Sequence, residues 1–172
     1  ARAGIMRCFD KLQQHANTVA AAQKLLGTEK ITDVMTREAN HKMAKAYYNL
    51  GKKAEALPLL TTLATDIKSV EGAEAKYLLT QMLFADKKYD QCEKEIMDFI
   101  QQSTPHQYWL AKSFILLSDV YQAKGDLFQS KHTLKSVVEN YAVNDDGIIE
   151  AASAKLIEIE RLEQDQILKS GN

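Results

Sequence analysis

One pattern of apolar and polar positions occurs three times in succession along the chain. The copies are residues 37–66, 73–102 and 111–140. Within each copy, apolar residues recur at steps of three and four, which is the spacing of one face of an α-helix. In each copy, two such runs are separated by a short segment that we read as a turn. The pattern therefore predicts two helices in each copy, an A helix followed by a B helix.

Short side chains recur at two places in every copy. The first small column follows an apolar position of the A helix and consists of Ala44, Thr80 and Ser118. The second small column opens the B helix and consists of Ala56, Cys92 and Ser130. Two helices approach to about 8–10 Å only where the side chains at their crossing are short. Because one pair cannot bury its apolar stripe alone, we expect neighbouring pairs to stack in a row.

These columns resemble the tetratricopeptide repeat (TPR). The third copy matches best, with Phe114, Leu117, Ser118, Tyr121, Gly125, Asp126, Ser130 and Leu134 in the pattern of the family. The other copies depart from it: Asn40 and Lys76 stand where the family has a bulky aromatic residue, and Lys87 replaces the turn glycine. The resemblance implies an all-α fold, a right-handed superhelix of antiparallel helix pairs (an α-solenoid), and a role in binding other proteins.

The pattern extends towards both ends of the chain. Ile5, Met6, Phe9, Leu12 and Thr18 fit the same columns 38 residues before the first copy, and Gln13 takes the turn position. After the last copy, a stripe from Ile148 to Leu162 predicts a final helix with an acidic outer face, a cap. We expect residues 1–172 to form a single repeat domain, a piece of a longer protein. Its parts are a partial repeat at 1–30, repeats at 31–68, 69–103 and 104–142, and a capping helix at 143–168.

One helix start is marked by its residue types. Thr104, Pro105 and Gln107 have the spacing of a capping box with proline at the first helical position. The third A helix should therefore begin near Pro105 and run for about 19 residues. Trp109 lies on its first turns, and we expect it to pack against the preceding repeat; the alternative is that it anchors a partner.

Composition and charge exclude several classes of protein. With 45% hydrophobic and 26% charged residues, the chain has the profile of a soluble globular protein. No apolar run approaches the roughly 18 residues of a membrane span. The net charge of -1 gives no reason to expect a nucleic-acid partner. Residues 1–30 are nevertheless basic (+3) and residues 143–172 acidic (-4), which allows a homo-oligomer through oppositely charged ends, or simply two solvated ends.

No set of residues predicts catalysis, a metal site or a cofactor. The two cysteines, Cys8 and Cys92, are far apart and lack the spacing of a zinc site or a disulfide framework. None of the histidines is paired with another His or Cys three or four residues away; they are His15, His41, His106 and His132. Nucleotide-binding and hydrolase motifs do not occur. We therefore expect a protein that is not an enzyme.

A binding surface is implied by the TPR resemblance. In that family the second, fifth, ninth, twelfth and thirteenth positions of each copy line the concave side. The partner-binding candidates are His41, Lys45, Tyr48, Asn49, Tyr77, Gln81, Phe84, Lys112, Asp119 and Gln122. Aromatic anchors among polar groups suit an extended peptide or a helix. Tyr77 and Phe84 could instead fill gaps between repeats. Some TPR proteins hold the C-terminal carboxylate of their ligand with Lys and Asn residues at set positions of consecutive A helices. Here only Lys45 lies near such a position, so we do not expect a ligand of that kind.

Three hypotheses for function follow. The first is an interaction scaffold that binds a peptide or a segment of a partner protein along the concave face. The second is a structural or self-assembly module that braces a larger protein. The third, an enzyme, would need polar groups converging in a pocket. The long repeats and the TPHQYW start are also similar to TPR proteins of the bacterial cell envelope, which would place the chain on the periplasmic side; a cytoplasmic location is the alternative.

Overall fold

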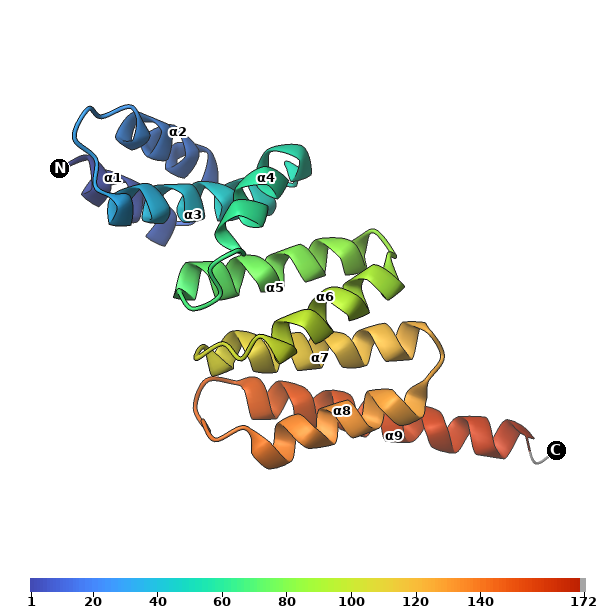
Figure 1. Ribbon diagram of the computed structural model, residues 1–172. Helices are drawn as coiled ribbons and strands as arrows, with labels where there is room; N and C mark the ends of the chain where they lie inside the picture. Colours follow the sequence, from blue (N-terminus) through green and yellow to red (C-terminus); the bar gives the residue numbers. More distant parts are fainter. Residues whose placement is uncertain (171–172) are drawn as a thin grey trace. The chain divides into compact units, whose positions relative to one another are not determined.

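The chain folds into α-helices joined by short turns (Figure 1). The computed structural model describes residues 1–170, and within that range every regular element is an α-helix. The helices are α1 (Arg2–Lys11), α2 (His15–Leu26), α3 (Asp33–Asn49), α4 (Lys53–Leu63), α5 (Val70–Ala85), α6 (Tyr89–Gln101), α7 (Gln107–Ala123), α8 (Leu127–Asn140) and α9 (Ile148–Ser170). None of them is long and apolar enough to cross a membrane. The all-α expectation is confirmed.

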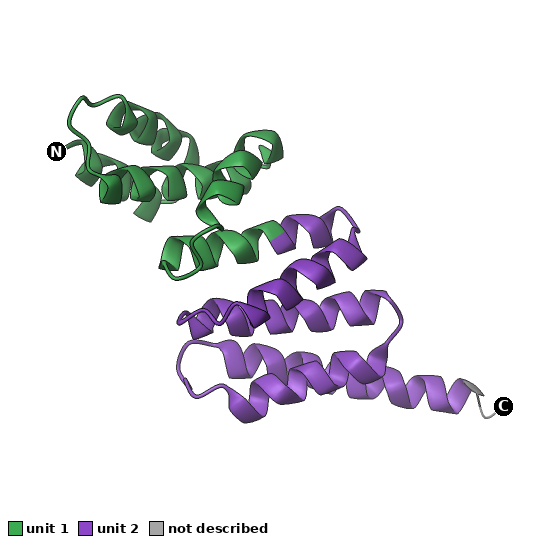
Figure 2. Ribbon diagram, in the orientation of Figure 1, with its two compact units in different colours: residues 1–79 green, residues 80–172 purple. Residues whose placement is uncertain are grey.

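Two compact units divide the chain, residues 1–79 and 80–172, with the boundary inside α5 (Figure 2). In unit 1, α2 packs against α1 on one side and α3 on the other, and α3 also packs against α4. Its core combines α1, α2 and α3, and includes Met6, Ala22, Leu25 and Met43. Each A helix of this unit is therefore covered by the B helix next to it in the chain.

Unit 2 repeats this order of packing. Helix α7 packs against α6 and α8, and α9 packs against α8 with a smaller contact to α7. The predicted stripe of the capping helix faces the core: Ile148, Ala152 and Ile159 are buried in one cluster with Leu134. Helix α9 thus occupies the position of the next A helix.

The turns between A and B helices share one backbone conformation. The turn residue of each repeat is left-handed, with φ values of 57°, 70°, 58° and 84° at Gln13, Gly51, Lys87 and Gly125. In every case the next amide donates a 2.9 Å hydrogen bond to a carbonyl five residues earlier, those of Phe9, Tyr47, Leu83 and Tyr121. This bond and the left-handed residue define the Schellman motif that ends a helix. The alignment of the repeats therefore placed all four turns correctly, including the two that lack glycine.

Both small columns are buried. Ala44, Thr80 and Ser118 are at most 1% exposed, and Ala56, Cys92 and Ser130 are fully buried. Four residues further along the B helices, Leu60, Ile96 and Leu134 are also fully buried. The short residues thus lie in the interior, as expected if they let neighbouring backbones approach.

Two helices begin later than the sequence pattern predicts. Helix α7 starts at Gln107, because His106 has a non-helical backbone (φ -88°, ψ 74°). The Thr104 hydroxyl accepts from the His106 amide at 3.2 Å, and the Gln107 side chain donates to the Thr104 carbonyl instead of completing a capping box. Helix α9 starts at Ile148, not at 143, after Gly147 turns the chain with a φ of 81°.

Candidate functional site

Charged residues at the second and ninth positions of the A helices in unit 1 make ion pairs between successive repeats. The ninth position of one repeat reaches the second position of the next: Arg7 Nη2 lies 2.6 Å from Glu38 Oε2, and Lys45 Nζ lies 2.6 Å from Glu74 Oε1. These pairs join α1 to α3 and α3 to α5. The regular spacing of the repeats brings the same two positions together each time, and here they carry opposite charges.

Glu74 is the most buried carboxylate of this set, with 8% of its surface exposed. Its Oε2 lies 2.8 Å from His41 Nε2, and its Oε1 contacts Lys45. Burial by itself raises the pKa of the Glu74 carboxyl group, but the hydrogen bonds from His41 and Lys45 outweigh burial and hold the pKa below its ordinary value. The carboxylate is therefore charged at neutral pH and fully engaged within the unit.

A second charged contact lies beside the first pair. Lys42 Nζ is 2.5 Å from Asp10 Oδ2, and Lys42 neighbours Glu38 on α3. The hydrogen bond from Arg7 lowers the pKa of Glu38 and raises that of Arg7. Helices α1 and α3 are thus joined by two ion pairs, which set their relative position along the face.

The other candidates of unit 1 differ in exposure. Tyr48 is half-buried, and burial raises the pKa of its phenol. Asn49 is exposed at the end of α3. Tyr77 is only 7% exposed. Tyr48 and Asn49 are consequently accessible to a ligand, whereas little of Tyr77 is.

In unit 2 the candidates lie on α5 and α7. Asp119 Oδ1 is 2.5 Å from Lys155 Nζ, a pair that joins α7 to α9. Lys112 lies over the rings of Tyr108 and Trp109, 5.5 and 5.2 Å from their centroids, close enough for cation–π attraction. The remaining members, Gln81, Phe84 and Gln122, are half-buried.

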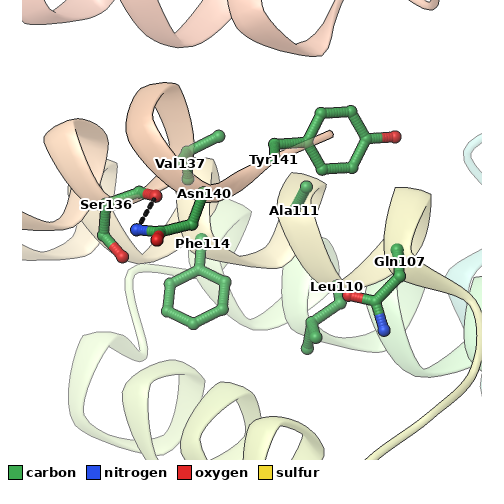
Figure 3. Close-up of a pocket in the computed structure, with 8 residues that line it drawn as sticks. All are labelled: Gln107, Leu110, Ala111, Phe114, Ser136, Val137, Asn140 and Tyr141. Atoms are coloured by element: carbon green, nitrogen blue, oxygen red, sulfur yellow. Dashed lines mark hydrogen bonds between the residues drawn. The ribbon is translucent and has the colours of Figure 1, made fainter. Parts of the chain in front are cut away.

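The structure also contains a hollow that the sequence did not predict. It measures about 190 Å³ and lies between the start of α7 and the end of α8 (Figure 3). Its lining is Gln107, Leu110, Ala111, Phe114, Ser136, Val137, Asn140 and Tyr141. Tyr141 donates a hydrogen bond to Asp146, and burial together with this bond raises the pKa of Tyr141 to about 12. The lining therefore combines an apolar floor with neutral polar groups.

An equivalent hollow of about 280 Å³ exists in unit 1, between α3 and the end of α4. Seven of its lining residues stand 74 positions before lining residues of the first hollow: Asp33, Thr36, Arg37, Asn40, Thr62, Leu63 and Asp66. Here Asn40 replaces Phe114, and Arg37 Nη1 forms a 3.3 Å ion pair with Asp66. The repeat alignment already showed that Asn40 takes the place of the aromatic residue. This replacement was the signal in the sequence that could have predicted a polar hollow here.

The described residues contain no cluster that suits a metal ion, and one of the two cysteines is buried. No group of three or more His, Cys, Asp or Glu side chains could hold a metal ion there. Cys8 is exposed and Cys92 is buried, and burial raises the pKa of the Cys92 thiol to about 12. Cys92 is therefore a neutral thiol at physiological pH, unsuited to nucleophilic chemistry.

Comparison with known proteins supports the fold but does not identify a family or a function. No family model matches the chain, and no curated protein does. Among solved structures, it is similar to the TPR-like repeats of a Podosopora anserina protein assigned as a kinesin light chain, with a TM-score of 0.65, and to a single-substitution variant of them, with 0.66. Each is 16% identical, and the alignment covers 98% of this chain and 90% of the other. The chain has a TPR-like fold; neither structure supports the resemblance to cell-envelope proteins.

Proposed function

We propose that this chain is a non-enzymatic scaffold that binds a peptide or a segment of a partner protein through the exposed side of its A helices. Folds of stacked helix pairs commonly bind partners on such surfaces. The observation that carries the proposal is the set of ion pairs between successive A helices in unit 1. A surface whose charges are already paired is held in one conformation, so a ligand loses less conformational entropy on binding to it.

Within unit 1, the accessible groups beside these ion pairs are Tyr48 and Asn49. Tyr48 offers an aromatic face and a hydroxyl group, and Asn49 offers an amide that can both donate and accept. Lys45 keeps about a third of its side chain exposed while it binds Glu74. Together they suit a peptide that presents an apolar side chain and backbone amides.

Unit 2 offers a comparable surface of its own. Phe84 packs on Tyr89 with a ring separation of 5.5 Å and remains partly exposed. Lys112, Asp119 and Gln122 supply charged and polar groups on α7. The surface of each unit thus combines an aromatic residue with hydrogen-bonding groups.

Selection of peptides on the intact chain tests this proposal. Peptides would be selected from a random displayed library, and their affinities measured for the wild type and for Tyr48→Ala and Phe84→Ala. Loss of a central aromatic contact costs about 2 kcal/mol or more, so we expect affinity to fall at least about 30-fold in one of the two variants.

Phe128→Ala is the matched control, because Phe128 is an aromatic residue on a B helix and is 64% exposed. It should leave the affinity unchanged. Equal affinities for Tyr48→Ala, Phe84→Ala and wild type, all with native circular dichroism, would remove the A-helix surface from consideration.

Self-assembly through oppositely charged ends has less support. Part of the acidic end is engaged within unit 2, where Glu163 pairs with Lys131 and Glu160 lies 4.0 Å from Lys135. At the basic end, Arg7 is paired with Glu38. These pairs reduce the charge that each end can offer to another molecule.

A further inference from the structure

The hollow between α7 and α8 in unit 2 has no charged side chain in its lining. Its floor is formed by Leu110, Ala111, Phe114 and Val137, of which Ala111 and Val137 are buried. A charged group placed against this floor would lose its hydration without gaining an ion pair. The hollow is therefore suited to an uncharged and largely apolar occupant.

The volume of the hollow limits what can occupy it. An apolar cavity of about 150 Å³ holds a benzene ring, so a hollow of about 190 Å³ has room for one aromatic side chain. Pockets that enclose a whole ligand are larger, about 300–1,000 Å³. The rings of Phe114 and Tyr141 are part of the lining, and aromatic rings pack favourably on one another. Size and lining thus favour a single aromatic side chain over a whole small molecule.

Two amide side chains at the rim present acceptors to the hollow. Asn140 Nδ2 donates a 2.9 Å hydrogen bond to the Ser136 carbonyl oxygen, and Gln107 Nε2 donates one of 3.3 Å to the Thr104 carbonyl oxygen. Each bond engages the nitrogen end of the amide and leaves the oxygen, Asn140 Oδ1 or Gln107 Oε1, available as an acceptor. Figure 3 shows the two amides on opposite sides of the lining. An occupant that donates one hydrogen bond is therefore complementary to this rim.

The stacking of repeats does not fill this position. In unit 1 the equivalent hollow, of about 280 Å³, persists although α2 precedes its repeat and packs against α3. In unit 2, α6 packs against α7 and α9 packs against α8, so both helices that line the hollow are also covered by their neighbours in the chain. The hollow thus remains when the neighbouring helices of the repeat array are in place.

We propose that the hollow between α7 and α8 binds one uncharged aromatic side chain that carries a hydrogen-bond donor, the tryptophan of a partner protein. Tryptophan fits better than tyrosine, because the indole N–H only donates and both rim amides offer oxygen atoms. The indole ring lies on the apolar floor, and its N–H donates to Asn140 Oδ1 or Gln107 Oε1. The site shares no residue with the A-helix surface proposed above and does not depend on it.

The hollow of unit 1 is an internal comparison. It has Asn40 in place of Phe114 and Arg37 in place of Ala111, and Arg37 forms an ion pair with Asp66. An indole ring would find no aromatic partner there, and it would remove water from the two charged groups. Tryptophan should therefore bind at the hollow of unit 2 and not at that of unit 1.

The test is a titration of the isotope-labelled 172-residue chain with N-acetyl-tryptophanamide, followed by NMR. This probe is uncharged and carries the tryptophan side chain between two peptide-like groups. The backbone amide signals of Ala111, Phe114 and Val137 should shift and saturate with a Kd of about 1 mM. The signals of Arg37 and Asn40 should not shift.

Removal of the donor isolates the hydrogen bond. The probe methylated on its indole nitrogen keeps the ring but cannot donate, and it should bind about fivefold more weakly. Gln107→Met and Asn140→Leu keep the size of the side chain, and each removes one acceptor. In one of these two variants the methylated and unmethylated probes should bind equally, which identifies the accepting oxygen.

Two further variants alter the hollow itself. Phe114→Asn gives unit 2 the residue that unit 1 has at Asn40, and it should weaken binding at least about tenfold. Ser136 is exposed, so Ser136→Leu leaves the core unchanged while it places a larger side chain over the hollow, and it should weaken binding equally. Gln129→Leu, two turns earlier on α8 and outside the lining, is the matched control and should bind as the wild type does.

Several outcomes would overturn the proposal. They are no saturable shift at millimolar probe, equal shifts at both hollows, unchanged binding in a folded Ser136→Leu variant, and equal affinity of the wild type for the methylated probe. Saturable binding of free indole without binding of the probe would assign the hollow to a small molecule. Shifts that appear without probe as the protein concentration rises would assign it to a second copy. None of these results bears on the A-helix surface, which is tested with Tyr48 and Phe84.

Discussion

The thiol of Cys92 lies 3.2 Å from the backbone carbonyl oxygen of Thr80 and donates a hydrogen bond to it. Thr80 belongs to the first small column and Cys92 to the second, and both are fully buried. The contact joins α5 and α6 within unit 2. It shows that the two columns of one repeat meet at the helix crossing, where a longer side chain would push the backbones apart.

Cys92→Leu tests this crossing. The leucine side chain has two more heavy atoms than that of cysteine, which must be placed in a filled core, and overpacking costs about 1–3 kcal/mol. The free energy of unfolding in urea should fall by that amount. Met97→Leu on the same helix is the control, since Met97 is 39% exposed and its replacement should change stability by less than about 0.5 kcal/mol.

The turn at Lys87 offers a stabilising change. Its φ of 58° is left-handed, which costs a non-glycine residue about 1–2 kcal/mol, partly offset by the larger entropy that glycine loses on folding. Lys87→Gly should therefore raise the free energy of unfolding by about 0.5–1 kcal/mol. The reciprocal Gly51→Lys should lower it by a similar amount, as Gly51 has a φ of 70° and open space around it. Changes of the same sign would show that backbone conformation does not decide stability here.

Gly72, near the start of α5, is packed against the loop before it. A Cβ atom at this position would lie 2.0 Å from the Asp66 carbonyl oxygen and 2.7 Å from that of Leu63. Gly72→Ala should destabilise the protein by about 3 kcal/mol, because the contact is with backbone and cannot relax by side-chain rotation. Gly4→Ala, on α1 with nothing within 4 Å, should instead stabilise it slightly. Similar thermal unfolding of both variants would contradict the close approach.

The buried carboxylate of Glu74 predicts an acid dependence of stability. Because its folded pKa is below the ordinary value, Glu74 contributes stability above its unfolded pKa of about 4.3, and this is lost as pH falls through the folded pKa. Glu74→Gln should cost about 2 kcal/mol at pH 7 and progressively less below pH 4. Glu71→Gln, one turn earlier on the same helix, is the matched control for replacing a glutamate by glutamine on α5. Urea unfolding at several pH values measures both.

Ser130 has a buried hydroxyl oxygen without a hydrogen-bond partner among the described residues. An unsatisfied buried polar group costs about 1–3 kcal/mol, and the first copy has alanine at the equivalent position, Ala56. Ser130→Ala should therefore stabilise the protein by about 1 kcal/mol. Ser136→Ala, on the exposed side of the same helix, measures the gain from helix propensity alone. If both changes have the same effect, the hydroxyl of Ser130 is not destabilising.

Most of the helical architecture could be predicted because it depends on local periodicity. The columns located the helix pairs, all four left-handed turns and the buried short residues such as Ala44 and Ser118. The exceptions were helix starts. The Thr104 hydroxyl accepts a hydrogen bond from the His106 amide, but the helix begins only at Gln107 and not at Pro105. Capping patterns locate an end only to within one or two residues, since neighbouring hydrogen-bond arrangements have similar energies.

The candidate site was predicted less completely. The A-helix positions were identified by resemblance, but their ion pairs were not foreseen. Lys45 and His41 converge on Glu74, and Asp119 pairs with Lys155. A list of polar residues on one face does not show which will meet a residue some 35 positions away. The binding role of all ten candidates remains a prediction.

The sequence by itself determined the helix pairs and their turns, because steps of three and four residues and a left-handed turn position are properties of a few neighbouring residues. Only the tertiary structure decided which charges are paired and which hollows remain between the helices. The physical reason is that exposure and ion pairing depend on the distance between elements, and that distance is fixed by the packing of the helices against one another.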